Sequence, residues 1–147
     1  MKKLNSISNI LDLAMSAELK AYQLYTDMAA MVENVWISKT LEGLAQEELL
    51  HHAKLKAVKA GRKTLKQEQV GKLDIPEMLE DVQPHPDMNY RDLLAFAIRK
   101  ENLSHKLYNR LASIFSEPHL RDTFLRLANE EAEHKRRFEM QYKSLTS

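Results

Sequence analysis

The chain has 147 residues, enough for one domain with a buried core, and its 44% hydrophobic and 29% charged residues are ordinary for a globular protein. A formal net charge of +1 without runs of like charge argues against a nucleic-acid partner, and no apolar stretch approaches the ~20 residues of a membrane span. The absence of cysteine excludes disulfides, thiolate metal sites and a cysteine nucleophile, and it fits the cytoplasm, where we expect the protein to lie.

The first 61 residues predict two long helices. Only three glycines and four prolines occur, and long segments lack both, which is typical of an all-α protein. Apolar residues recur at steps of three and four over residues 8–34 and 37–60, and Gly61 is suited to end the second helix. Because the connection between them is short, these helices should form an antiparallel hairpin.

A long crossover is predicted over residues 62–88, which contain one glycine and three prolines. One short helix is predicted within it, at residues 75–81. A helix of 24 residues is ~36 Å long. The connection over residues 62–88 is long enough to span that distance. We therefore expect the crossover to return along the bundle, so that the helices on either side of it run parallel.

The last part of the sequence predicts a second hairpin, with helices over residues 90–115 and 116–143. Asp87 or Asn89 is suited to cap the first of these helices. Ser116 is suited to cap the second, with Pro118 in its first turn. Residues 1–147 are thus predicted to form a single domain, a four-helix bundle of two hairpins joined by one crossover.

The two predicted hairpins are copies of each other. At an offset of 83 residues the chain aligns with itself without a gap, and LAQEELLH at residues 44–51 recurs as LANEEAEH at residues 127–134. Earlier in each hairpin, Glu18 aligns with Glu101 and Tyr25 with Tyr108. A bundle with this internal symmetry should bring matching residues to the same level of the core.

The stripe of each helix that should face the core is apolar except near its centre. The polar residues on these stripes are Glu18, Glu48, His51, Glu101, Glu131 and His134. Four carboxylates in a dry core would be costly and would repel one another. Two divalent cations would balance their charge, which predicts a dinuclear metal site. Without metal the carboxylates should share protons, and some of their pKa values should rise.

Two further repeated pairs flank this site. One Glu-x-x-His motif alone is a weak signal, but two in register with two more stripe glutamates are a strong one. Glu47 and Glu130 lie one step off the stripe, and we expect them to be solvated or to contact the ligands. Tyr25 and Tyr108 are either core aromatics or hydrogen-bond donors to the ligating carboxylates, and we favour the second interpretation.

These motifs resemble those of the ferritin-like di-iron superfamily, and most closely the rubrerythrin-type domain. The resemblance implies a ferritin-like bundle that binds two iron ions, with manganese or zinc as alternative metals. It also implies bridging carboxylates at Glu48 and Glu131, and one terminal carboxylate and one histidine for each metal. The terminal ligands would be Glu18 and Glu101, and the histidine ligands His51 and His134.

The sequence departs from the family pattern at three points. Ser104 stands where rubrerythrins carry a further glutamate, so the ligand set is closer to that of bacterioferritin. Bacterioferritins bind haem through a methionine at the position of Leu49, so we expect no haem here. Rubrerythrins also carry a cysteine-rich rubredoxin module, and without cysteines this chain would need an external electron donor protein.

The resemblance implies an oxidoreductase that reduces peroxide or dioxygen in oxidative-stress defence. The main alternative is a ferroxidase or iron-binding protein for iron handling or storage. A hydroxylase is less favoured, and a metal-free helical interaction module is the remaining alternative. We expect a homodimer, formed either side by side or by exchange of the similar hairpins.

Overall fold

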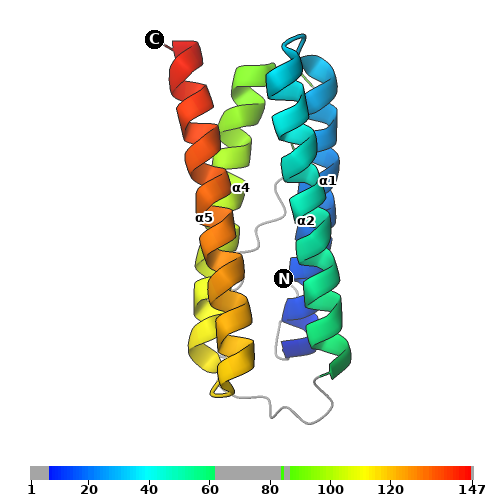
Figure 1. Cartoon of the computed structure of the whole chain (residues 1–147), viewed down its shortest axis with the longest axis vertical. Coiled ribbons are helices and arrows are strands. Elements are labelled where there is room, and N and C mark those ends of the chain that lie inside the picture. The colour runs from blue at the N-terminus through cyan, green and yellow to red at the C-terminus, as the bar shows by residue number, and fades with distance from the viewer. Residues whose placement is uncertain (1–6, 62–83, 85–86, 147) are drawn as a thin grey trace.

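The computed structural model describes residues 7–61, 84 and 87–146. Within these residues the chain forms four long helices and no strand (Figure 1). The helices are α1 (Ile7–Met31), α2 (Val35–Gly61), α4 (Tyr90–Ile114) and α5 (Pro118–Thr146). The all-α prediction is confirmed, and none of the helices described is long and apolar enough to cross a membrane. The predicted crossover and its short helix lie almost entirely outside the described residues.

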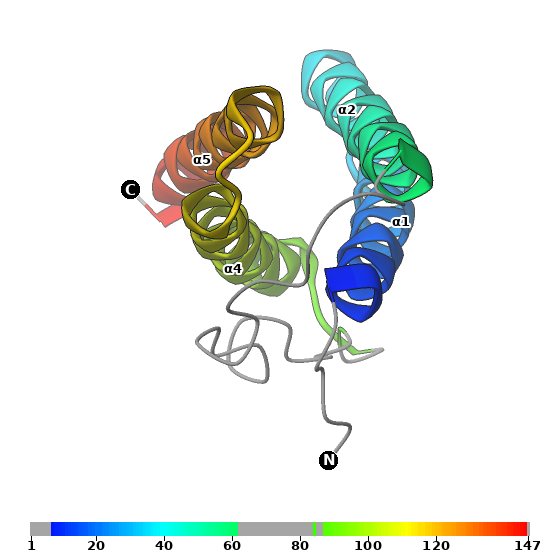
Figure 2. The same cartoon turned by 90° about the horizontal axis from the view of Figure 1, so that it is seen from below.

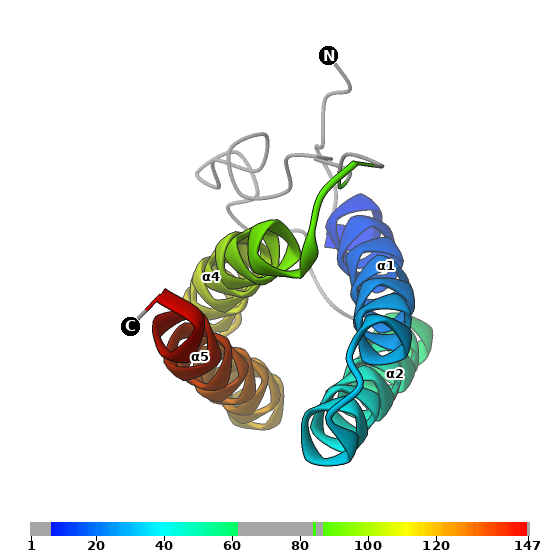
Figure 3. The ribbon, with the colours of Figure 1, turned by 90° about the horizontal axis from the view of Figure 1, so that it is seen from above.

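The helices form two antiparallel hairpins, α1–α2 and α4–α5, and most close contacts lie within a hairpin. Figure 1 shows that α2 and α4 run in the same direction, as predicted, and that α1 and α5 run in the opposite one. Seen along the bundle, α1 lies beside α4 and α2 beside α5 (Figures 2 and 3). Each helix therefore packs against the other helix of its own hairpin and lies beside one helix of the other hairpin.

Asn34 sets the connection between α1 and α2. Its side-chain oxygen accepts hydrogen bonds from the backbone N–H groups of Trp36 and Ile37, at 2.9 and 3.2 Å. These bonds satisfy N–H groups that the first helical turn leaves unpaired. As a result α2 begins at Val35, two residues earlier than predicted, and α1 ends at Met31 rather than at Asn34.

The second hairpin has one cap that was predicted and one that was not. Asn89 caps α4, because its side-chain oxygen accepts the backbone N–H of Asp92 at 2.9 Å. The prediction that Ser116 caps α5 is wrong. The Glu117 carboxylate takes this role and accepts the N–H groups of residues 119 and 120 at 3.0 and 2.9 Å. Its negative charge also suits the positive end of the helix dipole.

The apolar core is divided into two clusters along the bundle. One, near the start of α1 and the end of α4, includes Ile10, Leu11, Leu55, Leu111, Phe124 and Leu127. The other, near the end of α1 and the start of α4, includes Met28, Leu41, Leu44, Leu94, Ala97 and Phe138. Between them lies a layer of buried glutamates and histidines. Water is therefore kept from this layer at both ends of the bundle.

Candidate metal centre

Every one of the four helices contributes to the buried polar layer. Its members are Glu18 from α1, Glu48 and His51 from α2, Glu101 from α4, and Glu131 and His134 from α5. Each is no more than 2% exposed, and apart from two tyrosines they are the only polar residues buried in the described part of the chain. All six residues predicted as metal ligands are thus brought together at one level of the core.

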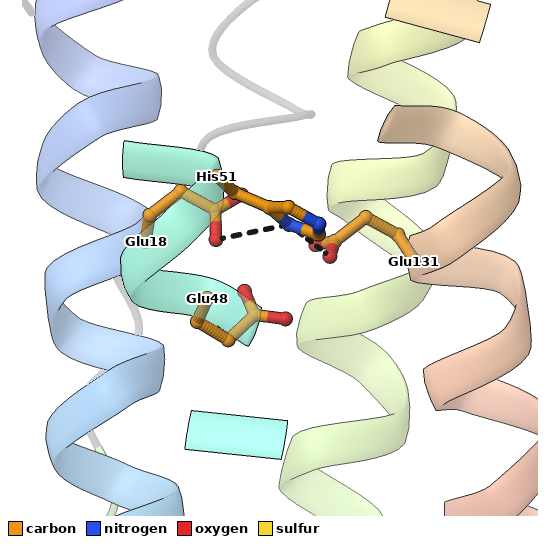
Figure 4. A group of neighbouring side chains, drawn as sticks. All are labelled: Glu18, Glu48, His51 and Glu131. Carbon is orange, nitrogen blue, oxygen red and sulfur yellow. Dashed lines mark ion pairs between the residues drawn. The ribbon is translucent and has the colours of Figure 1, made fainter. Parts of the chain in front are cut away.

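The six side chains form two groups that share two members. Glu18 and His51 belong to the first group, Glu101 and His134 belong to the second, and Glu48 and Glu131 belong to both. Within each group one ligand atom per residue lies within 4.8 Å of the others. Figure 4 shows the first group, with side chains from α1, α2 and α5 pointing toward one another. Two sites that share two carboxylates are the arrangement of a dinuclear metal site.

Each of the six side chains has one buried atom without a hydrogen-bond partner. These atoms are Glu18 Oε2, Glu48 Oε1, His51 Nδ1, Glu101 Oε2, Glu131 Oε1 and His134 Nδ1, and among the described residues only the Tyr90 hydroxyl shares this condition. Buried polar atoms are nearly always hydrogen-bonded, so six such atoms in one place need an explanation.

The unbonded atoms are close together but are not aligned for hydrogen bonds. His51 Nδ1 lies 3.0 Å from Glu131 Oε1, and His134 Nδ1 lies 2.7 Å from Glu48 Oε1, without hydrogen-bond geometry. Oxygen and nitrogen donors that converge in this way fit metal ions bound among them. Four carboxylates with two imidazoles suit iron, manganese or zinc.

The two tyrosines contact the carboxylates across the bundle. Tyr25 of α1 donates its hydroxyl hydrogen bond to Glu101 of α4, and Tyr108 of α4 donates to Glu18 of α1. Burial, and next the charge of the bonded glutamate, raises the pKa of both phenols well above 10. Both therefore remain O–H donors. Each tyrosine bonds the glutamate of the other hairpin, not the one that lies a heptad away on its own helix.

Each histidine has a second contact on the side facing away from the site. His51 Nε2 lies 2.7 Å from Glu130 Oε2, and His134 Nε2 lies 3.0 Å from Glu47 Oε2. The two rings stack with their centroids 5.8 Å apart and their planes at 11°. We predicted that Glu47 and Glu130 would be solvated or would contact the ligands. Each side chain is partly exposed to solvent and also contacts one of the two histidines. The signal for them in the sequence was their repetition at the offset of 83 residues.

The carboxylates of this layer differ in their affinity for protons. Burial, and next the charge of Glu101, raises the pKa of Glu48 and of Glu131 well above 4.5. Burial alone would also raise the pKa of Glu18, but its contacts with Glu48 and His51 lower it overall. Burial alone would lower the pKa of His51, but Glu131 and Glu18 raise it to about 11. Without metal the layer thus holds protons that metal ions must displace.

These pKa shifts predict that the metal-free protein becomes less stable as the pH rises. Folded Glu48, Glu131 and His51 bind protons more tightly than their unfolded counterparts, so the free energy of unfolding falls with increasing pH. For His51 this loss begins above pH 6.5 and continues through about pH 11. The lowered pKa of Glu18 stabilises the folded protein at neutral pH, and this contribution is lost only as the pH falls below about 4.5.

Urea unfolding of the metal-free protein at several pH values between about 6 and 9 checks this expectation. The metal-loaded protein is the control, because its ligands have already lost their protons and its stability should not fall over this range. A metal-free protein whose stability stayed constant or rose with pH would contradict the charge distribution described here.

Comparison with known proteins supports the fold. Residues 92–147 match the family model of rubrerythrin, which confirms the resemblance inferred from the motifs. A hypothetical protein from Pyrococcus furiosus shares the fold with a TM-score of 0.77 at 20% identity, over 96% of this chain and 90% of that one. KatB, a manganese catalase from Anabaena PCC7120, has a TM-score of 0.70 at 20% identity, over 99% of this chain and 76% of that one.

Among curated proteins, no significant match to the sequence was found. The chain is therefore a ferritin-like, all-α bundle, as predicted, and its buried glutamates and histidines form a candidate dinuclear metal site.

Proposed function

We propose that the protein is a di-iron oxidoreductase that reduces hydrogen peroxide or dioxygen and serves in oxidative-stress defence. The observation that carries this proposal is the convergence of six unbonded donor atoms, one from each predicted ligand, in the dry centre of the bundle. The rubrerythrin match over residues 92–147 and the fold shared with a manganese catalase support redox chemistry on a peroxide-like substrate.

The shared membership of the two groups supports a role for each ligand. Glu48 and Glu131 would bridge the metals, because both groups contain them. One metal would be completed by Glu18 and His51, and the other by Glu101 and His134. Four carboxylate charges would then balance two divalent cations, which removes the repulsion that the carboxylates would otherwise suffer.

If these residues held a ferrous pair, it would supply the two electrons needed to convert one hydrogen peroxide and two protons into two water molecules. The residues around the site serve this reaction by holding the ligands in place. Tyr25 and Tyr108 donate hydrogen bonds that fix the carboxylates of Glu101 and Glu18. The apolar clusters on both sides limit the access of water. An external electron donor protein would then return two electrons.

Disproportionation of peroxide at two manganese ions is the second candidate, favoured by the shared fold with a manganese catalase. The same carboxylate-rich ligands suit manganese as well as iron. Ferrous oxidation for iron storage would use these ligands too, but the iron would then leave the site after each oxidation.

An anaerobic titration with ferrous iron should saturate at two ions per chain, because the two groups of donor atoms share two carboxylates. Stopped-flow mixing of the loaded protein with peroxide or with dioxygen then identifies the oxidant. We expect faster oxidation by peroxide and repeated turnover with a reductant while iron stays bound.

Other results would redirect or overturn the proposal. Release of ferric iron after each oxidation would indicate a ferroxidase, and oxygen evolution by manganese-loaded protein would indicate a catalase. Saturation at one metal per chain, or at none, would rule out the dinuclear site itself.

A further inference from the structure

We propose that a hollow between α2 and α5 binds a small organic anion, whose acidic group would contact cationic side chains and whose apolar part would lie against aliphatic ones. The hollow has a volume of about 520 Å³ and lies where α2 ends and α5 begins, at the lower end of the bundle in Figure 1. Sites for small molecules usually measure roughly 300–1,000 Å³. None of the six candidate metal ligands lines this hollow, so the inference goes beyond the proposed function.

The lining of the hollow combines an aliphatic floor with polar groups. Ala57, Val58 and Leu120 are its apolar members, and the last two also pack against the core cluster near the start of α1. Lys54 of α2 and Arg126 of α5 bring positive charge to it from both helices. An apolar cavity with a few convergent polar groups is the usual composition of a small-molecule site. The hollow therefore fits a ligand with an apolar part and a charged part.

The positive charge of the hollow is poorly compensated. Among the residues that the structure describes, the Arg126 side chain forms no hydrogen bond or ion pair. Lys54 Nζ lies 4.0 Å from Glu130 Oε2, and because both side chains are nearly half exposed this ion pair is weak. Glu117 also lines the hollow, but its two carboxylate oxygens accept N–H groups at the start of α5, at 3.0 and 2.9 Å. Its charge is thus balanced by the helix dipole, and the two cations would attract an anion.

A second hollow is the counterpart of this one under the sequence repeat. It lies at the other end of the same two helices, where α2 begins and α5 ends. At the offset of 83 residues, the residues that line the two hollows correspond, as the following pairs show: His119 with Trp36, Thr123 with Thr40, and Lys54 with Arg137. The same framework is therefore built twice, once at each end of the bundle.

The two hollows differ in size and in charge. The second has a volume of about 220 Å³, less than half that of the first. The indole of Trp36 lines it where His119 lines the first, and Gly43 stands at the position that corresponds to Arg126. A hollow that followed only from the packing of two repeated hairpins should have similar contents at both ends. The space and the second cation are specific to the hollow near the start of α5.

The chemistry of the lining indicates the class of ligand. The guanidinium of Arg126 can donate two parallel hydrogen bonds to a carboxylate or a phosphate, and the ammonium of Lys54 can contact the same group as a point charge. The ring of His119 offers a further N–H donor. The aliphatic floor would add affinity in proportion to the apolar area that a ligand buries. We therefore expect organic anions to bind more tightly than inorganic phosphate.

An anionic dye and its uncharged analogue separate the effect of charge from that of the apolar floor. Anilinonaphthalene sulfonate and anilinonaphthalene share their aromatic rings, and the fluorescence of both rises in apolar surroundings. Lys54→Gln and Arg126→Gln remove one charge each, and Ala57→Glu adds a carboxylate at an exposed lining residue. Arg137→Gln is the matched control, because Arg137 is the counterpart of Lys54 in the second hollow. Fluorescence titration of the full chain measures both affinities, and circular dichroism checks that each variant is folded.

We expect the wild-type chain to bind one molecule of the sulfonate dye, and inorganic phosphate to compete with it. Lys54→Gln and Arg126→Gln should each weaken this binding by about 3–10-fold, between the effects of an exposed ion pair and of a charge-assisted hydrogen bond. Ala57→Glu should weaken it at least as much. Both glutamine variants should bind the uncharged analogue as the wild type does, and Arg137→Gln should bind both dyes normally.

Three results would overturn the proposal. The first is an unchanged affinity for the sulfonate dye in both Lys54→Gln and Arg126→Gln. The second is an equal loss in Arg137→Gln or for the uncharged analogue, because the two cations would then have no specific role. The third is a folded wild-type chain that binds no sulfonate dye. The six candidate metal ligands are intact in every variant, so none of these results would contradict the metal site.

Discussion

Replacing Glu48 or Glu131 by alanine should abolish the binding of both metal ions, whereas replacing Glu18 or Glu101 should weaken mainly one. The reason is that Glu48 and Glu131 belong to both groups of ligand atoms, and the other two glutamates belong to one group each. Removing a partner of a metal ligand costs about 10–100-fold in affinity, so removing a shared ligand should cost more than about 100-fold at each metal.

Metal analysis of the purified variants after anaerobic loading checks this difference. Glu48→Ala and Glu131→Ala should retain no metal, and Glu18→Ala and Glu101→Ala should retain one ion per chain. The Glu42→Ala variant changes an exposed residue, so it controls for losses of metal during purification and loading. It should bind two metal ions per chain. If Glu48→Ala still bound two ions with wild-type affinity, the assignment of the bridging ligands would be wrong.

The fold was predictable because each helix carries its own pattern. Apolar residues at steps of three and four, the scarcity of glycine and proline, and the long proline-containing connection together predicted four helices and a parallel α2 and α4. The ends were less predictable, because they depend on single hydrogen bonds. Glutamate is not among the preferred capping residues, yet the carboxylate of Glu117 reaches two N–H groups and replaces the expected Ser116.

The candidate ligands were also predictable, because a charged residue on an apolar stripe conflicts with burial unless something compensates it. Glu48 and Glu131 both occupy such a position, and each is followed three residues later by a histidine. This repetition favoured a metal site as the explanation for the buried charges. The pairings between hairpins could not be predicted in this way. The offset of 83 residues shows that Tyr25 and Tyr108 are equivalent, but not that each bonds the glutamate of the other half.

The proposed metal site would place metal binding and the stability of the metal-free protein in conflict. Proteins can gain stability when a buried ion pair is replaced by well-packed hydrophobic residues of similar volume, because no charge then has to be desolvated. The raised pKa values of Glu48 and Glu131 identify these two carboxyls as groups whose ionised form is disfavoured by the fold. Glu18 differs, because the lowered pKa shows that its ionised form is favoured by its surroundings.

The double variant Glu48→Gln/Glu131→Gln should therefore be more stable than the metal-free wild type. A glutamine has the size of a glutamic acid and, like its protonated form, can donate a hydrogen bond, here to the remaining carboxylates. It has no proton to lose as the pH rises. We expect a gain of ~1–4 kcal/mol at neutral pH, the range seen when buried ionic groups are replaced. For a chain of this length each kcal/mol corresponds to about 2–4 °C in Tm.

The order of stability should reverse when metal is added. Metal stabilises only a protein whose folded state binds it, so loading should raise the Tm of the wild type and leave that of the double variant unchanged. Thermal unfolding with and without zinc measures all four states, and Glu18→Gln serves as the contrasting variant. Because the pKa of Glu18 is lowered, its replacement should destabilise the metal-free protein. A double variant that melted below metal-free wild type would show that these two carboxylates stabilise the fold even without metal, contrary to the electrostatics of this layer.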